Sequence, residues 1–245
     1  MTGPGGAAAG GSATAPVEHH HADVSGGWLR AATFGAMDGL VTNIALIAGV
    51  GGGGLAPRTI VLTGVAGLAA GAISMGIGEY TSVRTQNEQV GAELAKELRE
   101  LRHNPEGEAD ELVAAWTARG LPHALARQVA DVLKDHPEQA LRVHAQEELG
   151  VVPDELPSPW TAAFSSFVCF AIGAVVPLLT YLFGVTALWP ALVVGGVGLF
   201  VAGVLVARFT GNPWWRSGLR QLLLGAAAAG ATYLVGVAVG VGAVT

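Results

Sequence analysis

One stretch of the sequence decides the fold class. Residues 58–83 read RTIVLTGVAGLAAGAISMGIGEYTSV and contain a single acidic side chain, Glu79. A helix needs about 20 predominantly apolar residues to cross the hydrocarbon core of a bilayer. Four further windows meet this requirement: residues 28–50, 160–183, 188–207 and 219–244. The sequence therefore predicts an all-α integral membrane protein with five transmembrane helices.

The composition supports this fold class and excludes several functions. Only 13% of the residues are charged, about half the usual share. A net charge of −6 argues against nucleic-acid binding, which requires a basic face. The single cysteine, Cys169, excludes a disulfide scaffold and a cysteine-based zinc site. The glycine run at 51–54 lacks the Lys and Ser/Thr of a phosphate loop. We expect neither an enzyme nor a prosthetic group.

Small residues four positions apart occur in three of the windows. This spacing lets membrane helices approach each other closely. The chain has 36 glycines, so some matches are expected by chance. We treat the following pairs as candidate helix contacts: Gly35 and Gly39, Gly67 and Gly71, and Gly236 and Gly240.

A charged segment separates the second window from the third. Residues 84–158 hold 15 of the 19 acidic and 8 of the 13 basic side chains, a net charge of −7. Caps and prolines divide the segment into helices at about 86–102, 105–119, 122–135 and 137–149, either as a small bundle or as an extension of the second span. In the third of these helices, Leu125, Val129, Val132 and Leu133 share one face.

The distribution of arginine sets the expected orientation. Five arginines flank one side of the spans, and only Arg58 flanks the other. We therefore expect a cytoplasmic N-terminus and insert and an external C-terminus. The predicted parts are a disordered tail (1–27), spans 1–2 (28–83), a helical insert (84–158) and spans 3–5 (159–245). The tail carries three histidines at 19–21, which could bind metal but are more often incidental.

Asp38 and Glu79 are the only acids within the five windows, and both are candidate functional residues. A carboxylate at bilayer depth costs at least a few kcal/mol, so it is rarely kept without a role. Thr42 and Asn43 lie about a turn from Asp38, and Met75 lies one turn before Glu79. A carboxylate beside a thioether suits a borderline metal such as Fe²⁺. The alternative is that Asp38 is a hydrogen-bonded structural carboxylate.

The glutamates of the insert are spaced to share helix faces. Glu93, Glu97 and Glu100 follow an i, i+4, i+7 pattern, and Glu108 and Glu111 an i, i+3 pattern. Such like charges repel, and divalent cations relieve the repulsion because carboxylate oxygens are their ligands. The alternative is a solvated acidic face that is offset by Lys96, Arg99 and Arg102. Glu100 and His103 form a single Glu-x-x-His pair, too few for a di-iron bundle.

Several of these segments together resemble a known family. They are Asp38-Gly-Leu-Val-Thr, the segment Ser74-Met-Gly-Ile-Gly-Glu-Tyr-Thr-Ser-Val83, the glutamate-rich insert and Pro157-Ser-Pro159. The sequence resembles the vacuolar iron transporter family, and within it the subgroup with a cytoplasmic metal-binding domain. The resemblance covers the chain from Trp28 to its C-terminus.

The resemblance implies a homodimer that moves Fe²⁺, often also Mn²⁺, out of the cytosol in exchange for protons. It implies a pathway between protomers that is lined by Asp38 and Met75. Some members have methionines where this chain has His144 and Ala145, so His144 is a candidate replacement ligand, and Zn²⁺ binding is also conceivable. The composition is typical of a high-GC prokaryote, which predicts the plasma membrane rather than a vacuole. In the insert, the resemblance places metal ligands at Glu97, Glu100, Glu108, Glu111 and Glu148.

Two other functions remain open on the sequence alone. The first is a membrane-anchored iron sensor or store that does not transport, which would have no need of Asp38 or Met75. The second is an exporter selective for Mn²⁺.

Overall fold

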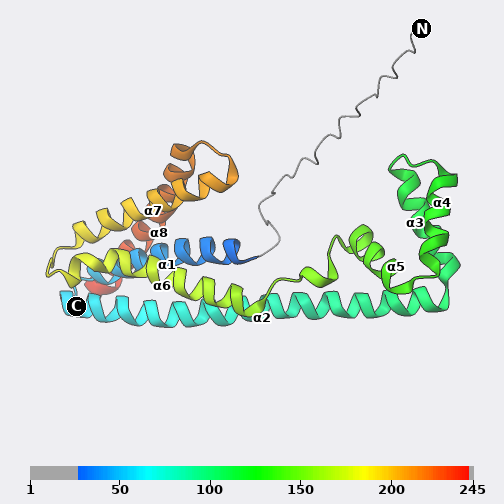
Figure 1. Ribbon diagram of the computed structural model, residues 1–245. Coiled ribbons are helices and arrows are strands. Elements are labelled where there is room, and N and C mark those ends of the chain that lie inside the picture. Colours follow the sequence, from blue (N-terminus) through cyan, green and yellow to red (C-terminus); the bar gives the residue numbers. More distant parts are fainter. Residues whose placement is uncertain (1–26, 243–245) are drawn as a thin grey trace, which may run out of the picture.

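The computed structural model describes residues 27–242, which contain helices and no strands (Figure 1). The predicted tail with its three histidines lies outside the described residues, apart from Gly27. The elements are α1 (Trp28–Gly52), α2 (Pro57–His103), α3 (Pro105–Ala118), α4 (His123–Lys134), α5 (Pro137–His144), a π-helical turn (Ala145–Leu149), a short 3-10 turn (Pro153–Glu155), α6 (Pro159–Leu182), α7 (Leu188–Thr210) and α8 (Trp214–Gly242).

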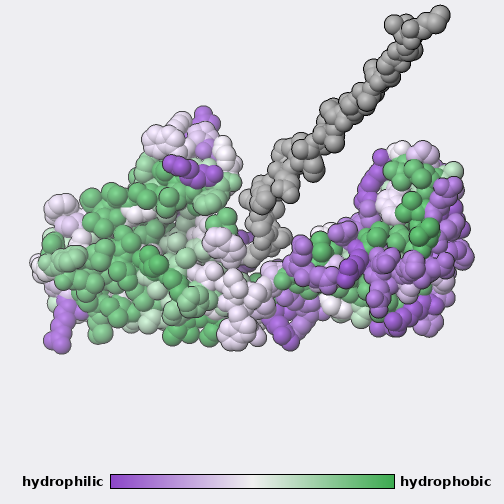
Figure 2. Space-filling model, viewed as in Figure 1, coloured by the Kyte–Doolittle hydropathy of each residue, from purple (hydrophilic) through white to green (hydrophobic). Residues whose placement is uncertain are grey.

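Five of these helices are long and apolar enough to cross a membrane: α1, α2, α6, α7 and α8. The prediction of five spanning helices is confirmed. Helix α1 is central, because it packs against α6 and α8 and also contacts α2 and α7. Figure 2 shows an apolar surface over this part of the molecule and a hydrophilic surface over α3–α5.

Glycines allow the closest of these helix contacts. A side chain at Gly39 would collide with the Phe170 carbonyl of α6, and one at Gly173 would collide with the Ala36 carbonyl of α1. The predicted pairs make contacts of the same kind: Gly35 and Gly39 with α6, Gly67 with Leu46, Gly71 with Phe170, and Gly236 and Gly240 with Gly49 and Gly53 of α1. All three candidate contacts are confirmed.

Helix α2 continues without a break from the membrane-spanning part into the insert. It is 47 residues long and runs along one edge of the molecule, with α1 and α6–α8 over its first half and α3–α5 over its second (Figure 1). The segment predicted as the first insert helix is therefore an extension of the second span. Helices α3 and α5 contact this extension, and α4 packs against α3 and α5. The insert is therefore both an extension of the second span and a small bundle.

Local signals placed the ends of the insert helices well. Asn104 precedes α3 and caps it by accepting a hydrogen bond from the Gly107 amide at 3.2 Å. Gly120 follows the end of α3 with a φ of +98°, and Gly150 ends the last helical segment with a φ of +65°. The predicted final helix differs in one respect: after His144 it widens into a π-helical turn.

The core of the insert lies between α3 and α4. Ala109, Leu112 and Val113 pack against Ala126 and Ala130. Ala126 and Ala130 are four residues apart and let α4 approach α3 closely. These small side chains of α4, and not its larger ones, therefore cover α3.

This packing leaves most of the predicted apolar face of α4 uncovered. Leu125, Val129 and Val132 are exposed, and only Leu133 packs against the core. The four residues share a face as predicted, but that face is not the core of the insert.

Candidate metal site

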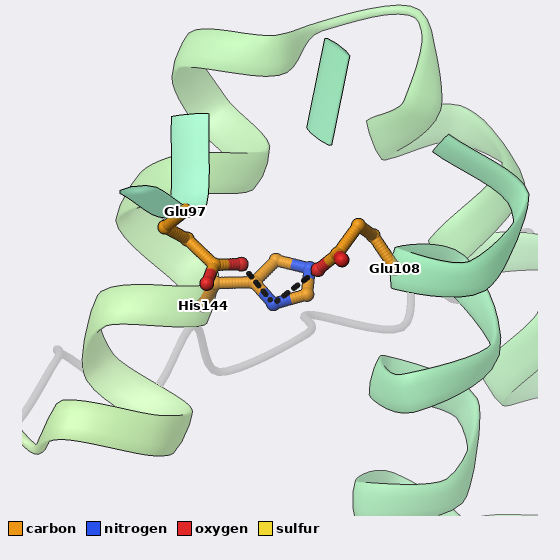
Figure 3. Close-up of side chains that lie close together, drawn as sticks. All are labelled: Glu97, Glu108 and His144. Carbon is orange, nitrogen blue, oxygen red and sulfur yellow. Dashed lines mark ion pairs between the residues drawn. The ribbon is translucent and has the colours of Figure 1, made fainter. Parts of the chain in front are cut away.

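Three side chains from different parts of the insert meet inside it (Figure 3). Glu97 comes from α2, Glu108 from the first turn of α3 and His144 from the end of α5. One ligand atom of each lies within 4.8 Å of those of the other two. The Nδ1 atom of His144 is 3.0 Å from Glu97 Oε1 and 3.7 Å from Glu108 Oε2. We call these three residues the insert cluster.

A fourth carboxylate joins the histidine from the π-helical turn. Glu148 Oε1 lies 2.8 Å from His144 Nδ1. Three carboxylates therefore converge on one nitrogen, which has at most one proton to share. The other ring nitrogen, Nε2, is buried and has no hydrogen-bond partner among the described residues. A neutral imidazole offers the free electron pair of one ring nitrogen to a metal, and this is the form in which histidine binds metals.

Burial and mutual repulsion raise the affinity of Glu97 and Glu108 for protons. Burial raises the pKa of Glu108 to about 7, with further contributions from the hydrogen bond and charge of Glu97, and His144 opposes the rise. Burial also raises the pKa of Glu97, and the negative charge of Glu148 adds to the effect. A divalent cation would replace these protons and remove the repulsion.

The other predicted glutamates lie at the edge of the insert cluster or away from it. Glu100 and Glu111 are exposed, and both lie near enough to raise the pKa of Glu97 by their charge. Glu93 is exposed, and no ion pair involves it within the described range. The structure thus gathers Glu97, Glu108, Glu148 and His144 and leaves Glu93 outside.

The basic side chains of the insert do not neutralise the insert cluster. Arg127 pairs with Asp110, Asp131 and Glu106, and Lys134 pairs with Glu106 at 2.6 Å. No lysine or arginine within residues 27–242 pairs with Glu97 or Glu108 within 4.0 Å. The side chains of Glu97 and Glu108 are only 14% and 7% exposed, so the interpretation as a solvated face is wrong for these two residues.

Glu147 has a structural role that the sequence did not reveal. Its carboxylate accepts a hydrogen bond from Trp116 Nε1 at 3.0 Å and pairs with Arg119. These contacts join the π-helical turn to the end of α3. They hold the turn that carries Glu148 next to His144.

Asp38 and Met75 lie in the membrane-spanning part. The Asp38 carboxylate accepts a hydrogen bond from Thr42 Oγ1 at 3.3 Å and is half-buried. Met75 packs beside Phe170 and Ala174 of α6. Asn43 ties α1 to α6, because its Nδ2 donates a hydrogen bond to the Ala174 carbonyl at 2.5 Å, while its Oδ1 is buried and has no hydrogen-bond partner among the described residues.

Glu79 is buried and has a partner that the sequence did not reveal. Arg30 of α1 places its Nη2 atom 2.8 Å from Glu79 Oε2. In the sequence, Arg30 is only one of the arginines that predict the orientation of the spans in the membrane. The two residues are 49 positions apart, and the sequence contains no local signal for their contact.

Known proteins resemble this chain over most of its length. The profile of the VIT family matches residues 29–237. Vacuolar iron transporter 1 of rice (Oryza sativa subsp. japonica) is 36% identical over 226 residues, which cover 88% of each chain. Vacuolar iron transporter 1 of Arabidopsis thaliana is 29% identical over 221 residues, 87% of this chain and 88% of the relative.

Two further relatives bear the same name. Vacuolar iron transporter 2 of rice is 34% identical over 212 residues, 84% of this chain and 85% of the relative. A vacuolar iron transporter of Acanthamoeba castellanii is 38% identical over 153 residues, 62% of this chain and 55% of the relative. With its five apolar helices and this similarity, the chain is a multi-pass membrane protein that belongs to the VIT family.

Proposed function

We propose that this protein exports Fe²⁺ from the cytosol across its membrane and that the insert cluster collects the ion. The relatives named vacuolar iron transporters support iron as the cargo. The insert cluster carries the rest of the proposal, because Glu97, Glu108 and His144 meet without a neutralising cation among the described residues.

The donor atoms of the insert cluster define which ions it fits. Carboxylates and an imidazole suit Fe²⁺ and also Mn²⁺ and Zn²⁺. Residues 84–158 contain neither methionine nor cysteine, so no sulfur ligand is available there. The ligands of the insert cluster are then carboxylate oxygens and one nitrogen, which His144 supplies. Glu148 adds a further oxygen, and Glu100 and Glu111 extend the negative field around the site.

In the membrane, the proposed path uses Asp38, Met75 and Glu79. Glu79 and Met75, one helical turn apart on α2, would receive the ion as it loses water. Asp38, in the middle of α1, would hold it at depth. Protonation of Asp38 or Glu79 from the far side weakens a metal ligand, which would couple export to proton entry.

The proposed assembly is a homodimer with this path between two copies of α1 and α2. Much of the surface of α2 is open in the single chain: 17% of its most apolar stretch is buried. We place the N-terminus and the insert in the cytoplasm. Arg30 and Arg84 flank the spans on this side, and arginine is enriched on the cytoplasmic side of membrane proteins. For a prokaryotic protein the membrane is the plasma membrane, and for a eukaryotic one it is the vacuolar membrane.

Uptake of Fe²⁺ into proteoliposomes with an imposed pH gradient and an internal pH dye tests this function. We expect uptake coupled to proton movement, loss of uptake in Asp38→Ala, and weaker uptake in the quadruple variant Glu97→Gln, Glu100→Gln, Glu108→Gln and Glu111→Gln. Mn²⁺ as a competing ion measures selectivity.

A control variant that also neutralises acidic side chains of the insert separates chelation from loss of charge. Asp135, Glu138 and Glu155 are exposed and have no ion-pair partner among the described residues. Their Asn and Gln variants keep the insert cluster intact, so we expect them to bind iron like the wild type. If iron binds the insert but never enters the vesicles, the protein is a sensor or store. If Mn²⁺ alone enters, it is a manganese exporter.

A further inference from the structure

The ion pair between Arg30 and Glu79 joins an exposed cation to a buried carboxylate. Arg30 lies in the first turn of α1, and its side chain is 61% exposed, whereas that of Glu79 on α2 is 8% exposed. The two atoms Nη2 and Oε2 are 2.8 Å apart. The carboxylate is therefore enclosed by the protein, and the guanidinium reaches it on a long side chain from the surface.

A buried carboxylate requires a cation. Leaving such a group unpaired costs several kcal/mol. Among the described residues, Arg30 is the only basic side chain within 4.0 Å of Glu79. Arginine keeps its proton throughout the physiological range, so the pair is not broken by loss of charge on the guanidinium. Glu79 becomes available to another cation only when Arg30 moves away.

The structure contains space into which Arg30 can withdraw. A cavity of about 710 Å³ opens beside it, with Arg30, Thr33 and Phe34 of α1 in one wall and Val206 and Phe209 of α7 in another. The cavity is mostly apolar, which suits the hydrocarbon stem of arginine. Rotation of the arginine side chain into this space would separate the guanidinium from Glu79 without movement of a helix.

We propose that Arg30 competes with the transported divalent cation for Glu79. In the absence of metal, Arg30 occupies the carboxylate. An arriving ion displaces it into the cavity, and its return helps to expel the ion toward the deeper part of the path. Arg30 is thus a positioning residue that lowers the affinity of the entry for metal. This inference rests on the proposed transport function.

The Fe²⁺ dependence of initial uptake rates in proteoliposomes tests the inference. Arg30→Gln removes the competitor, and we expect a KM lower by about two- to tenfold, which corresponds to about 0.4–1.4 kcal/mol. The maximal rate falls because the ion leaves Glu79 more slowly. Arg30→Lys keeps the charge, and we expect a KM within about twofold of wild type.

Two controls separate competition from a structural role. Arg84→Gln removes a cation that pairs with Glu88 four residues away on the same helix, and we expect it to leave the KM unchanged. In a Glu79→Gln background, Arg30→Gln should have no further effect on the KM. We also expect Fe²⁺ to raise the melting temperature of detergent-solubilised Arg30→Gln at lower concentrations than it does for wild type.

The possible failures are distinct. An Arg30→Gln protein with a lower melting temperature and an unchanged or higher KM shows that the pair is a structural clamp and overturns the inference alone. Wild-type protein that takes up no metal overturns the proposed function, and the inference falls with it.

Discussion

Glu108 shows how one buried side chain makes the insert sensitive to pH. Its pKa is raised to about 7, chiefly by burial, from an ordinary value of about 4.3 in an unfolded chain. Between these two values the folded protein binds more protons than the unfolded one. The free energy of unfolding therefore decreases as the pH rises from about 4.5 to about 7 and levels off above that.

We expect Glu108→Gln to remove most of this pH dependence. The variant keeps a neutral group in the buried position, so the metal-free protein should be more stable than wild type by roughly 1–3 kcal/mol above pH 7. Thermal unfolding in detergent with a chelator, at a series of pH values, measures the difference. Glu138→Gln, an exposed position, should follow the wild-type curve. Parallel curves for Glu108→Gln and wild type would contradict the raised pKa.

His144 is the second residue with a distinct chemical role. Calorimetric titration with Fe²⁺ under anaerobic conditions should show an affinity lower by about tenfold or more in His144→Ala, because the insert cluster loses its only nitrogen ligand. For wild type, the affinity should rise with pH up to about 7, since Glu108 must release its proton to bind the ion.

His103→Ala is the matched control for His144. Its Nδ1 atom lies 2.7 Å from the Arg99 carbonyl, and the side chain is exposed. We expect this variant to bind Fe²⁺ like the wild type. Equal losses of affinity in His103→Ala and His144→Ala would show that His144 is not a ligand.

At the scale of the elements, the contact between α1 and α6 depends on glycine. A Cβ atom at Gly39 would collide with the Phe170 carbonyl, and a backbone atom cannot rotate away. We expect Gly39→Ala to destabilise the protein by about 1–3 kcal/mol. The melting temperature in detergent reports this loss.

Gly230 of α8 provides the comparison. Nothing lies within 4 Å of a Cβ atom built there, and alanine is favoured over glycine in a helix by about 1 kcal/mol. Gly230→Ala should therefore melt at the same temperature as wild type or higher. If Gly39→Ala is as stable as Gly230→Ala, the close packing of α1 on α6 is wrong.

The elements also show where sequence reasoning succeeds and where it ends. The five spans and the ends of α3 were predictable because length, hydropathy, Asn104 and Gly120 act locally. The face of α4 that packs inward was not, since it depends on which side α3 covers.

The same limit applies to the candidate site. The spacing of Glu97 and Glu108 was visible, and the resemblance suggested that His144 joins them. The π-helical turn and the partnership of Arg30 with Glu79 arise only when distant segments meet, so no periodicity in the sequence encodes them.

At the scale of the whole molecule, charge is concentrated away from the spans. The insert has a net charge of −7, which raises the local concentration of cations. Raising the salt concentration from about 10 to about 150 mM shortens the screening length from about 30 to about 8 Å. We expect the KM for Fe²⁺ uptake to increase by about two- to fivefold over this range, with the maximal rate unchanged.

A variant that neutralises Asp135, Glu138 and Glu155 tests the origin of this effect. It removes charge and leaves the insert cluster in place, so we expect a smaller increase of the KM with salt. An increase equal to that of wild type would assign the effect to the insert cluster itself.

The unbroken helix α2 places the insert cluster and the membrane entry at a fixed separation. Glu97 follows Glu79 by 18 positions, which corresponds to about 27 Å along the helix axis at about 1.5 Å per residue. No side chain bridges such a gap, so under the proposed function an ion released by the cluster travels through water as a free hydrated ion. The insert would then act as a reservoir in series with the pore. It would smooth fluctuations in the iron supply, and the spans alone would set the time of each crossing.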